Sequence, residues 1–360
     1  MPSIRLGLRR SAVAAAVVVT LILQRQLPGV SRDTLPASLT DAEFWSLSEK
    51  LSEPDGFFRS NSGSPDNLLS NEITVSTVAA ALSREVKPSG VYLGVGPEQN
   101  FTYIVAMRPR IAFITDIRRG NLHLHLLYKA LFEMSNDRAS FVGRLFGRRQ
   151  PAGLSAKSSA AELMRAYVGA EAVDEPAFQA NLKAVVAHLT KTRTFRLGQD
   201  DIEGIEYVYR NFYQFGPSIH YTSSIGGRNG ASSYAAIMMS TDRDTGAERT
   251  YLATEANFVL VKAMQQRNLI VPVVGDFAGP KALRGIGAWL RDRGAVLSAF
   301  YVSNVEDYLR RNGVWPNFCA NVATMPLDGS SVFIRPNGRY MSFSPVQAEI
   351  AACRGRPSGR

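Results

Sequence analysis

Cysteine and histidine are scarce in this chain. Its 360 residues include two cysteines, Cys319 and Cys353, and four histidines. Two cysteines cannot build a disulfide scaffold or a cysteine-based zinc cluster. His123 and His125 are two positions apart, and on a helix that spacing points side chains in different directions, which makes them a poor metal pair. We therefore expect no metal site.

Three motifs of common enzyme classes are also absent. The sequence contains no Gly-x-Ser-x-Gly nucleophile elbow, no phosphate-binding P-loop and no His-Glu-x-x-His pair. Hydrolase, nucleoside-triphosphatase and zinc-protease functions are therefore without support. No specific nucleic-acid motif is present either, although the net charge of +10 favours anionic partners such as nucleotides, nucleic acid or acidic lipid headgroups. A solvated basic surface explains that charge equally simply.

The overall composition is that of a folded globular protein. Hydrophobic residues make up 45% of the chain and charged residues 20%, with a mean hydropathy of −0.08. This excludes a disordered chain on one side and a polytopic membrane protein on the other. The length suits one large domain or two of ordinary size.

The N-terminus is typical of a targeting segment. Arg5, Arg9 and Arg10 precede the apolar residues 11–23, a pattern found in signal peptides. This run is shorter than the roughly 20 residues that span a bilayer. We predict that residues 1–39 are a targeting or anchor segment with its linker, which makes the protein exported or membrane-tethered and allows membrane association through this segment. A misassigned start or a buried helix would instead leave the protein cytoplasmic.

The remainder alternates between strand and helix patterns. Residues 91–93 and 111–115 read as buried strands followed by helices, and the alternation resumes with strands at 269–274 and 295–302. This order predicts an α/β fold with a mostly parallel sheet. We expect residues 40–135 and 251–335 to be its two halves, separated by a helical insertion and loop, and followed by a basic tail. The insertion covers residues 136–250 and the tail covers residues 336–360.

Two local patterns add detail to this prediction. Thr40 with Glu43 and Ser303 with Glu306 both have the form of a helix capping box. Residues 322–325 and 331–334 read as closing strands. If the protein is exported, Cys319 and Cys353 could pair.

Ligand-binding candidates follow the predicted strands, because parallel sheets bind ligands at the carboxyl ends of their strands. Gly94 and Gly96 form a sharp turn, where glycine lets the backbone approach a ligand. Asp116 ends the second strand about 20 positions further on, where a carboxylate can accept hydrogen bonds from ribose hydroxyls. Asp276 and Phe277 follow the third strand and could meet the base or the reacting end of a ligand.

These residues resemble a known family. Leu93-Gly94-Val95-Gly96-Pro97 together with Asp116 is similar to the cofactor-binding signature of class I S-adenosylmethionine-dependent methyltransferases. Residues 92–103 and 274–280 also look like an uncharacterised bacterial family of that architecture, over about residues 41–335. The resemblance implies a Rossmann-like, methyltransferase-type sheet with an inserted helical subdomain. The chain departs from the pattern in two places: Tyr92-Leu93 replaces the usual acidic residue, and no Asn/Asp-Pro-Pro-aromatic motif follows the fourth strand.

The resemblance also implies roles for individual residues. Gly94 and Gly96 would approach the methionine portion of S-adenosylmethionine and Asp116 its ribose, and Asp276 would occupy the position of a motif that contacts the methyl acceptor. The candidate cofactor-binding residues are Gly94, Gly96, Pro97, Gln99, Asn100, Asp116, Asp276 and Phe277. The candidate substrate residues are Asn71 and Glu72, which precede a helix and could fold over the cofactor, and Tyr234, which could form a lid with residues 226–230. The methyl acceptor is not identified by any motif.

Two alternatives remain open. An exported or tethered protein could keep the fold as a non-catalytic binding protein, since a cofactor made in the cytosol is not expected outside it. An NADP-type oxidoreductase is the other reading, because Arg118 and Arg119 beside Asp116 could hold the ribose phosphate of NADP. Gln99 opposes it by occupying the third glycine position of a dinucleotide fingerprint.

Overall fold

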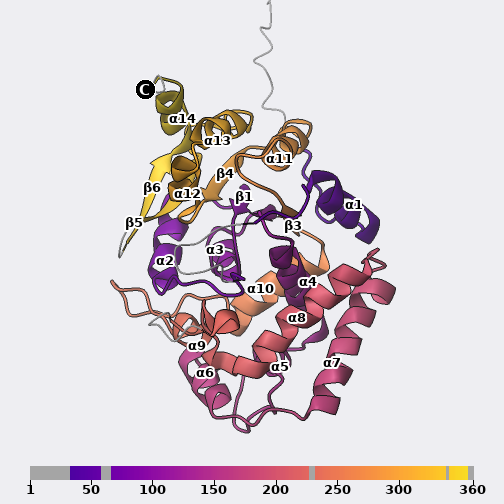
Figure 1. Cartoon of the computed structure of the whole chain (residues 1–360). Coiled ribbons are helices and arrows are strands. Elements are labelled where there is room, and N and C mark those ends of the chain that lie inside the picture. Colours follow the sequence, from indigo (N-terminus) through magenta and orange to yellow (C-terminus); the bar gives the residue numbers. More distant parts are fainter. Residues whose placement is uncertain (1–32, 58–65, 227–231, 338–339, 356–360) are drawn as a thin grey trace, which may run out of the picture. The chain divides into compact units, whose positions relative to one another are not determined.

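A six-stranded sheet in the order β3-β2-β1-β4-β5-β6 forms the centre of the fold (Figure 1). The structure is a computed structural model that describes residues 33–57, 66–226, 232–337 and 340–355. The first five strands in this order are parallel, and β6 pairs antiparallel with β5. The strands are β1 (Val91–Gly94), β2 (Ile111–Asp116), β3 (Ile270–Val274), β4 (Leu297–Tyr301), β5 (Val332–Asn337) and β6 (Tyr340–Pro345). The prediction of an α/β fold with a mostly parallel sheet is confirmed.

The central strands are buried over their whole length, because helices cover both faces of the sheet. Every residue of β1, β2 and β3 is buried. Such continuous apolar runs are typical of parallel strands that are covered on both sides. Pro272, which cannot donate a backbone hydrogen bond, lies in β3 at one edge of the sheet, where proline is tolerated.

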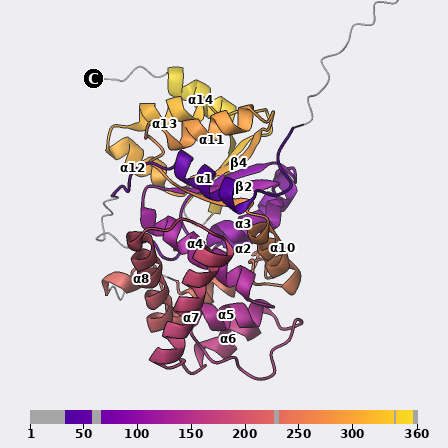
Figure 2. The ribbon, with the colours of Figure 1, turned by 90° about the vertical axis from the view of Figure 1, so that its right-hand side faces the viewer.

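The helices divide between the two faces of the sheet. They are α1 (Asp41–Leu51), α2 (Val75–Glu85), α3 (Gln99–Met107), α4 (Arg119–Met134), α5 (Arg138–Phe146), α6 (Ala160–Val168), α7 (Glu175–Ala187), α8 (Gln199–Phe215), α9 (Tyr234–Met238), α10 (Glu255–Gln266), α11 (Ala282–Arg291), α12 (Val305–Arg311), α13 (Trp315–Val322) and α14 (Val346–Gly355). Short turns of other helical types cover His188–Thr192, Gly216–Ser218 and Ser223–Ile225. Figures 1 and 2 show α11, α13 and α14 on one face and α3, α4 and α10 on the other.

The segment between α4 and β3 is helical, as the sequence patterns predict. Helices α5 to α9 lie there, and the described residues of this segment add no strand to the central sheet. Helices α5, α7 and α8 contact α4, which itself packs on β2 and β3. The helical segment is therefore built onto one face of the sheet through α4 (Figure 2).

The local helix signals have different outcomes. The Thr40 hydroxyl accepts from the backbone N–H of Glu43, and the Glu43 carboxylate accepts from the backbone N–H of Thr40, so the first capping box is confirmed. The second is wrong: α12 begins after Asn304 without a side-chain cap, because Ser303 bonds to Glu72 and Glu306 pairs with Arg335.

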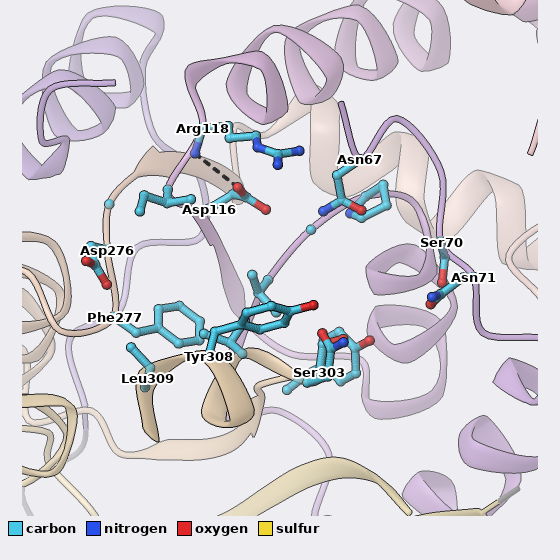
Figure 3. Close-up of a pocket in the computed structure, with 18 of the residues that line it drawn as sticks. Asn67, Ser70, Asn71, Asp116, Arg118, Asp276, Phe277, Ser303, Tyr308 and Leu309 are labelled. Carbon is cyan, nitrogen blue, oxygen red and sulfur yellow. Dashed lines mark hydrogen bonds between the residues drawn. The ribbon is translucent and has the colours of Figure 1, made fainter. Parts of the chain in front are cut away.

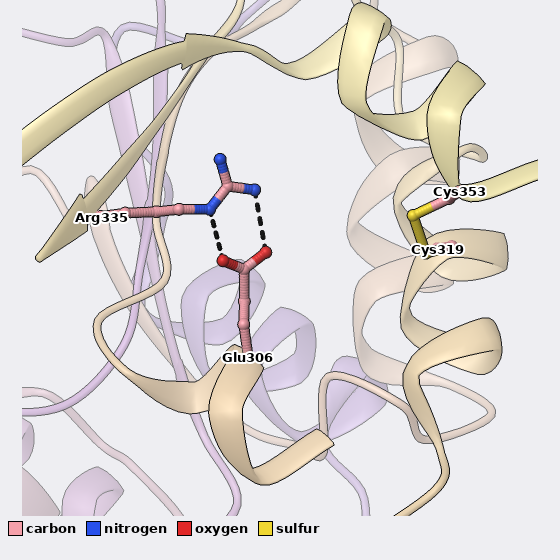
Figure 4. The surroundings of a disulfide bond; sticks show 4 residues. All are labelled: Glu306, Cys319, Arg335 and Cys353. Atoms are coloured by element: carbon pink, nitrogen blue, oxygen red, sulfur yellow. Dashed lines mark hydrogen bonds and ion pairs between the residues drawn. A yellow bond between two sulfur atoms is a disulfide. The ribbon is translucent and has the colours of Figure 1, made fainter. Parts of the chain in front are cut away.

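The C-terminal part is more structured than predicted. Residues 322–325 are not a strand, because Val322 ends α13 with Phe318 and Cys319 buried on the same face. The predicted tail contains β6 and α14. Cys319 and Cys353 form a disulfide that joins α13 to α14, and Arg335 forms a two-bond ion pair with Glu306 (Figure 4).

The predicted targeting segment lies mostly outside the described residues, which begin at position 33. Within the described part of the chain, no helix combines the length and the apolar character needed to cross a membrane.

Candidate functional site

A cavity of about 350 Å³ opens at the carboxyl ends of β1, β2, β3 and β4 (Figure 3). This volume falls within the range of small-molecule sites. β1 lies between β2 and β4 in the sheet, so the chain reverses its direction of strand addition at β1. Such a switch point leaves a crevice in which parallel sheets bind ligands.

The loop between β1 and α3 forms one wall of the cavity. The Asn100 amide donates to the backbone carbonyls of Val95, Gly96 and Pro97 at 3.0, 3.1 and 2.8 Å. Gly96 has φ +78°, a conformation that favours glycine. A Cβ on Gly94 would lie 2.0 Å from Asn100 Oδ1, so that glycine makes room for the amide. Gly96 and Pro97 line the cavity, whereas Gly94 and Asn100 lie outside its lining and shape the loop.

Two further side chains hold this loop. His125 Nε2 lies 2.9 Å from the Gly96 carbonyl, and burial lowers the pKa of His125 to about 4, so the neutral ring donates through Nε2. Gln99 Nε2 donates to the Val95 carbonyl at 3.0 Å. Gln99 Oε1 has no hydrogen-bond partner although Gln99 is buried and lines the cavity. This oxygen can accept a bond from a ligand.

Asp116 lies at the end of β2 and lines the cavity beside Asn67 and Arg118 (Figure 3). Its Oδ1 accepts the backbone N–H of Arg118 at 3.0 Å. Burial raises the pKa of Asp116, while the bond from Arg118, the charge of Arg118 and the side chain of Asn67 favour its charged form. The carboxylate is thus held in place with acceptor capacity left for a ligand.

Glu72 provides a second carboxylate on the cavity wall. Tyr103 donates to Glu72 Oε2 at 3.1 Å, and Tyr301 and Ser303 both donate to Oε1, with the Ser303 bond at 3.3 Å. Burial raises the pKa of Glu72. Tyr301 and Ser303 stand at the carboxyl end of β4, so this carboxylate lies at the β4 side of the cavity.

The end of β3 supplies Asp276 and Phe277 to the cavity. Asp276 accepts the backbone N–H of Ala278 at 2.8 Å, and the Phe277 ring packs edge-to-face against Phe300 at 5.0 Å. β3 pairs with β2 and not with β4, so Asp276 lies on the Asp116 side of the cavity. Its contact with a methyl acceptor stays a prediction.

The sequence patterns did not point to α12 as part of the site. Val305, Tyr308 and Leu309 from this helix close the cavity opposite the β1 loop, and Figure 3 shows Tyr308 and Leu309 beside Phe277. Ser303 was assigned to a capping box and Tyr301 to a strand core. Only the folded arrangement reveals that both also face Glu72.

The predicted lid residue is not at the cavity. Tyr234 is fully buried, its hydroxyl bonds to that of Tyr251, and its ring packs edge-to-face on Phe146 at 5.0 Å. It is a core residue because α9 turns this ring into the helical segment. Residues 227–230 of the predicted lid lie outside the described residues. The other two substrate candidates, Asn71 and Glu72, do line the cavity.

The fold is α/β, with a cavity of small-molecule size at the carboxyl edge of its parallel sheet. The chain matches the family described as a domain of unknown function (DUF7790) over residues 68–203 and 231–349, which is more than half of its length. It belongs to that family. No curated protein matches the chain.

Proposed function

We propose that the cavity binds S-adenosylmethionine and that the protein is a methyltransferase of the Rossmann-like type. The observation that carries this proposal is the pairing of Gly96 and Asp116 at the ends of adjacent strands on one cavity. A glycine turn after the first strand and a carboxylate after the second is the arrangement in which Rossmann-like proteins hold an adenosine ribose. The strand order with β1 at the switch point supports the same fold type.

The residues present fit an adenosyl group. Asp116 would accept the ribose hydroxyls, and the backbone at Gly96 and Pro97 would lie against the methionine portion. Ile117 and Phe277 add apolar surface next to Asp116, which suits the faces of an adenine ring. Gln99 Oε1, which lacks a donor, would accept one from the ligand.

The charge of the cavity favours this cofactor over NADP. Among the described residues, Glu72, Asp116 and Asp276 line the cavity together with one guanidinium, that of Arg118. NADP would bring several phosphate charges to these carboxylates, whereas S-adenosylmethionine carries a sulfonium and an ammonium group. Arg119 does not line the cavity, and its guanidinium forms a two-bond ion pair with Asp201 at 2.7 and 3.0 Å.

The bound cofactor would supply an electrophilic methyl group. Methyl transfer requires chiefly that the acceptor atom, the methyl group and the sulfonium lie in line, so positioning can supply much of the rate. In this chain, Asn100 and His125 fix the β1 loop, and α12 closes the opposite wall. The cavity therefore restrains a ligand without a dedicated nucleophile.

Calorimetric titration of the full chain with S-adenosylmethionine tests the proposal. We expect saturable binding that Asp116→Asn weakens about 10- to 100-fold, because hydrogen bonds to a charged group contribute about 1.5–3 kcal/mol. Asp242→Asn is the matched control, since Asp242 is a buried carboxylate outside the cavity lining. Binding of NADPH in place of S-adenosylmethionine, or equal affinity in the Asp116 variant, would overturn the proposal.

One observation favours a second candidate, an exported binding protein without catalytic activity. The Cys319–Cys353 disulfide is of a kind that persists in oxidising compartments, where S-adenosylmethionine is not expected. Labelling of free thiols on the protein from its native source separates the two candidates. Oxidised cysteines together with no methyl transfer to any cell extract favour the second candidate, and reduced cysteines oppose it.

A further inference from the structure

The environment of Glu72 lacks a positive charge. Hydroxyl groups from three residues donate to its carboxylate, namely Tyr103, Tyr301 and Ser303. Within the described part of the chain, no lysine, arginine or histidine pairs with it, and no nearby cation lowers its pKa. Removing a carboxylate from water is costly unless an opposite charge completes its surroundings. The described residues supply no such charge here.

Gln99, another residue that lines the cavity, has a side-chain acceptor without a hydrogen-bond donor. Gln99 is 2% exposed, and its Oε1 receives no hydrogen bond. Gln99 Nε2 faces the Val95 carbonyl, which can only accept, so Oε1 is the atom left without a donor. Water or a ligand group with an N–H or O–H would satisfy it.

The charge balance of the lining points the same way. Glu72, Asp116 and Asp276 face one guanidinium, that of Arg118, among the described residues of the lining. The chain as a whole carries a net charge of +10. The described part of the lining is therefore acidic on a basic protein, which favours a ligand with a positive charge at the Glu72 end.

We infer that Glu72 and the hydroxyls around it form a subsite for a cationic nitrogen of the ligand, with Gln99 Oε1 as a further acceptor. The inference rests on the proposed function, because a methyltransferase has two ligands that could supply this nitrogen. One is the α-ammonium of the adenosyl cofactor, and the other is the amine of a methyl acceptor. Both are ammonium groups, which donate hydrogen bonds and complete the charge of a carboxylate.

The first arm of the test compares two adenosyl ligands on the full chain by calorimetry. S-adenosylhomocysteine carries the ammonium group, and methylthioadenosine keeps the adenosine but lacks the amino-acid part. If the cofactor supplies the nitrogen, Glu72→Gln weakens S-adenosylhomocysteine about tenfold or more and leaves methylthioadenosine within twofold. Unchanged binding of methylthioadenosine also shows that the variant is folded. Asp242→Asn, which changes a buried carboxylate outside the cavity lining, is the matched control and keeps the ratio of the two affinities.

The second arm tests the acceptor as the source. The amine n-butylamine and the neutral n-butanol are titrated into protein saturated with methylthioadenosine. If an acceptor supplies the nitrogen, wild-type protein binds the amine and not the alcohol, and Glu72→Gln loses this preference. The inference is overturned if wild-type protein and Glu72→Gln show the same ratio of affinities for S-adenosylhomocysteine and methylthioadenosine and also bind the amine equally.

Failure of the proposed function gives a different result. In that case methylthioadenosine does not bind to wild-type protein, whereas the comparison of amine and alcohol without it still tests Glu72. The inference then stands if Glu72→Gln abolishes the preference for the amine, and falls if it does not.

Discussion

Glu72 and Glu133 are two carboxylates that the fold shields from water, and the groups that contact them differ in charge. Glu133 in α4 lies within 2.9 Å of Lys129 Nζ, 2.7 Å of Arg193 Nη2 and 2.6 Å of His188 Nε2. These contacts hold the pKa of Glu133 below its usual value despite its burial. Glu72 receives only hydroxyl groups, and burial raises its pKa.

The contrast separates a structural region from the proposed binding region. Lys129 also donates to the Gln265 carbonyl, and Arg193 reaches Asp41 at the start of α1, so the Glu133 cluster ties α4 to neighbouring elements. The fold neutralises that cluster with its own cations. The carboxylate at the cavity is oriented but not neutralised, which is the state expected of a group that meets a charged ligand.

Breaking the Glu133 cluster is expected to have the largest effect. Glu133→Gln leaves Lys129 and Arg193 buried or half-buried with less compensation, and we expect a loss of about 3–5 kcal/mol in the free energy of unfolding. Urea unfolding measures this loss. Because the folded pKa of Glu133 is lowered, its stabilisation is present above its usual pKa and disappears as the pH falls through the lowered value.

The matched substitution at the cavity sharpens the comparison. Glu72→Gln removes a charge that the folded state disfavours, so the free energy of unfolding should stay the same or rise slightly. An equal loss of stability in both variants would mean that Glu72 is as structural as Glu133.

Glu98 is a third buried carboxyl group. It is fully buried, accepts the backbone N–H of Ser70 at 3.2 Å, and does not line the cavity. Burial raises its pKa to about 8. The folded state therefore favours the protonated acid, and its contribution is complete below the usual pKa and is lost as the pH rises through about 8.

The pH dependence of unfolding tests this assignment. Between these two pKa values wild-type protein should lose up to about 1.4 kcal/mol of stability per pH unit relative to Glu98→Gln, in which the titrating group is absent. Parallel curves for the two proteins would show that Glu98 does not titrate in this range.

The smallest expected effect comes from one hydroxyl on Glu72. Ser303→Ala removes a single donor at 3.3 Å and keeps both tyrosine bonds. We expect affinity for an ammonium-bearing ligand to fall about two- to fivefold, which corresponds to about 0.5–1 kcal/mol and is typical of one such bond. Calorimetry against methylthioadenosine as the neutral reference measures it, and a tenfold or larger loss would mean that Ser303 positions the cavity wall as a whole.

The sequence predicts the sheet better than it predicts the site. Buried runs such as residues 111–115 and the turn at Gly96 are local signals, and the structure places both as expected. The position of β3 beside β2 is set by pairing between distant residues, so the side of the cavity that holds Asp276 could not be read from its neighbours. Trp315, Phe318 and Val322 follow helical spacing and belong to α13, which ends where a strand at residues 322–325 is predicted.

The polar partners of the site were harder to predict for a related reason. Tyr103 and Tyr301 look like core aromatics in sequence, and their hydroxyls meet Glu72 only because α3, β4 and the segment before α2 converge. Tyr234 shows the opposite case, a residue in a loop-like context whose ring is fully buried. Residue type and spacing do not determine which way such side chains point.

A crystal structure of the full chain with S-adenosylhomocysteine is the most direct measurement. We expect the ribose hydroxyls on the carboxylate of Asp116 and the chain of the ligand running past Gly96 toward the β4 side. A ligand bound elsewhere on the protein, or an Asp116 side chain turned onto a protein cation with no ligand beside it, would contradict the assignment of this cavity.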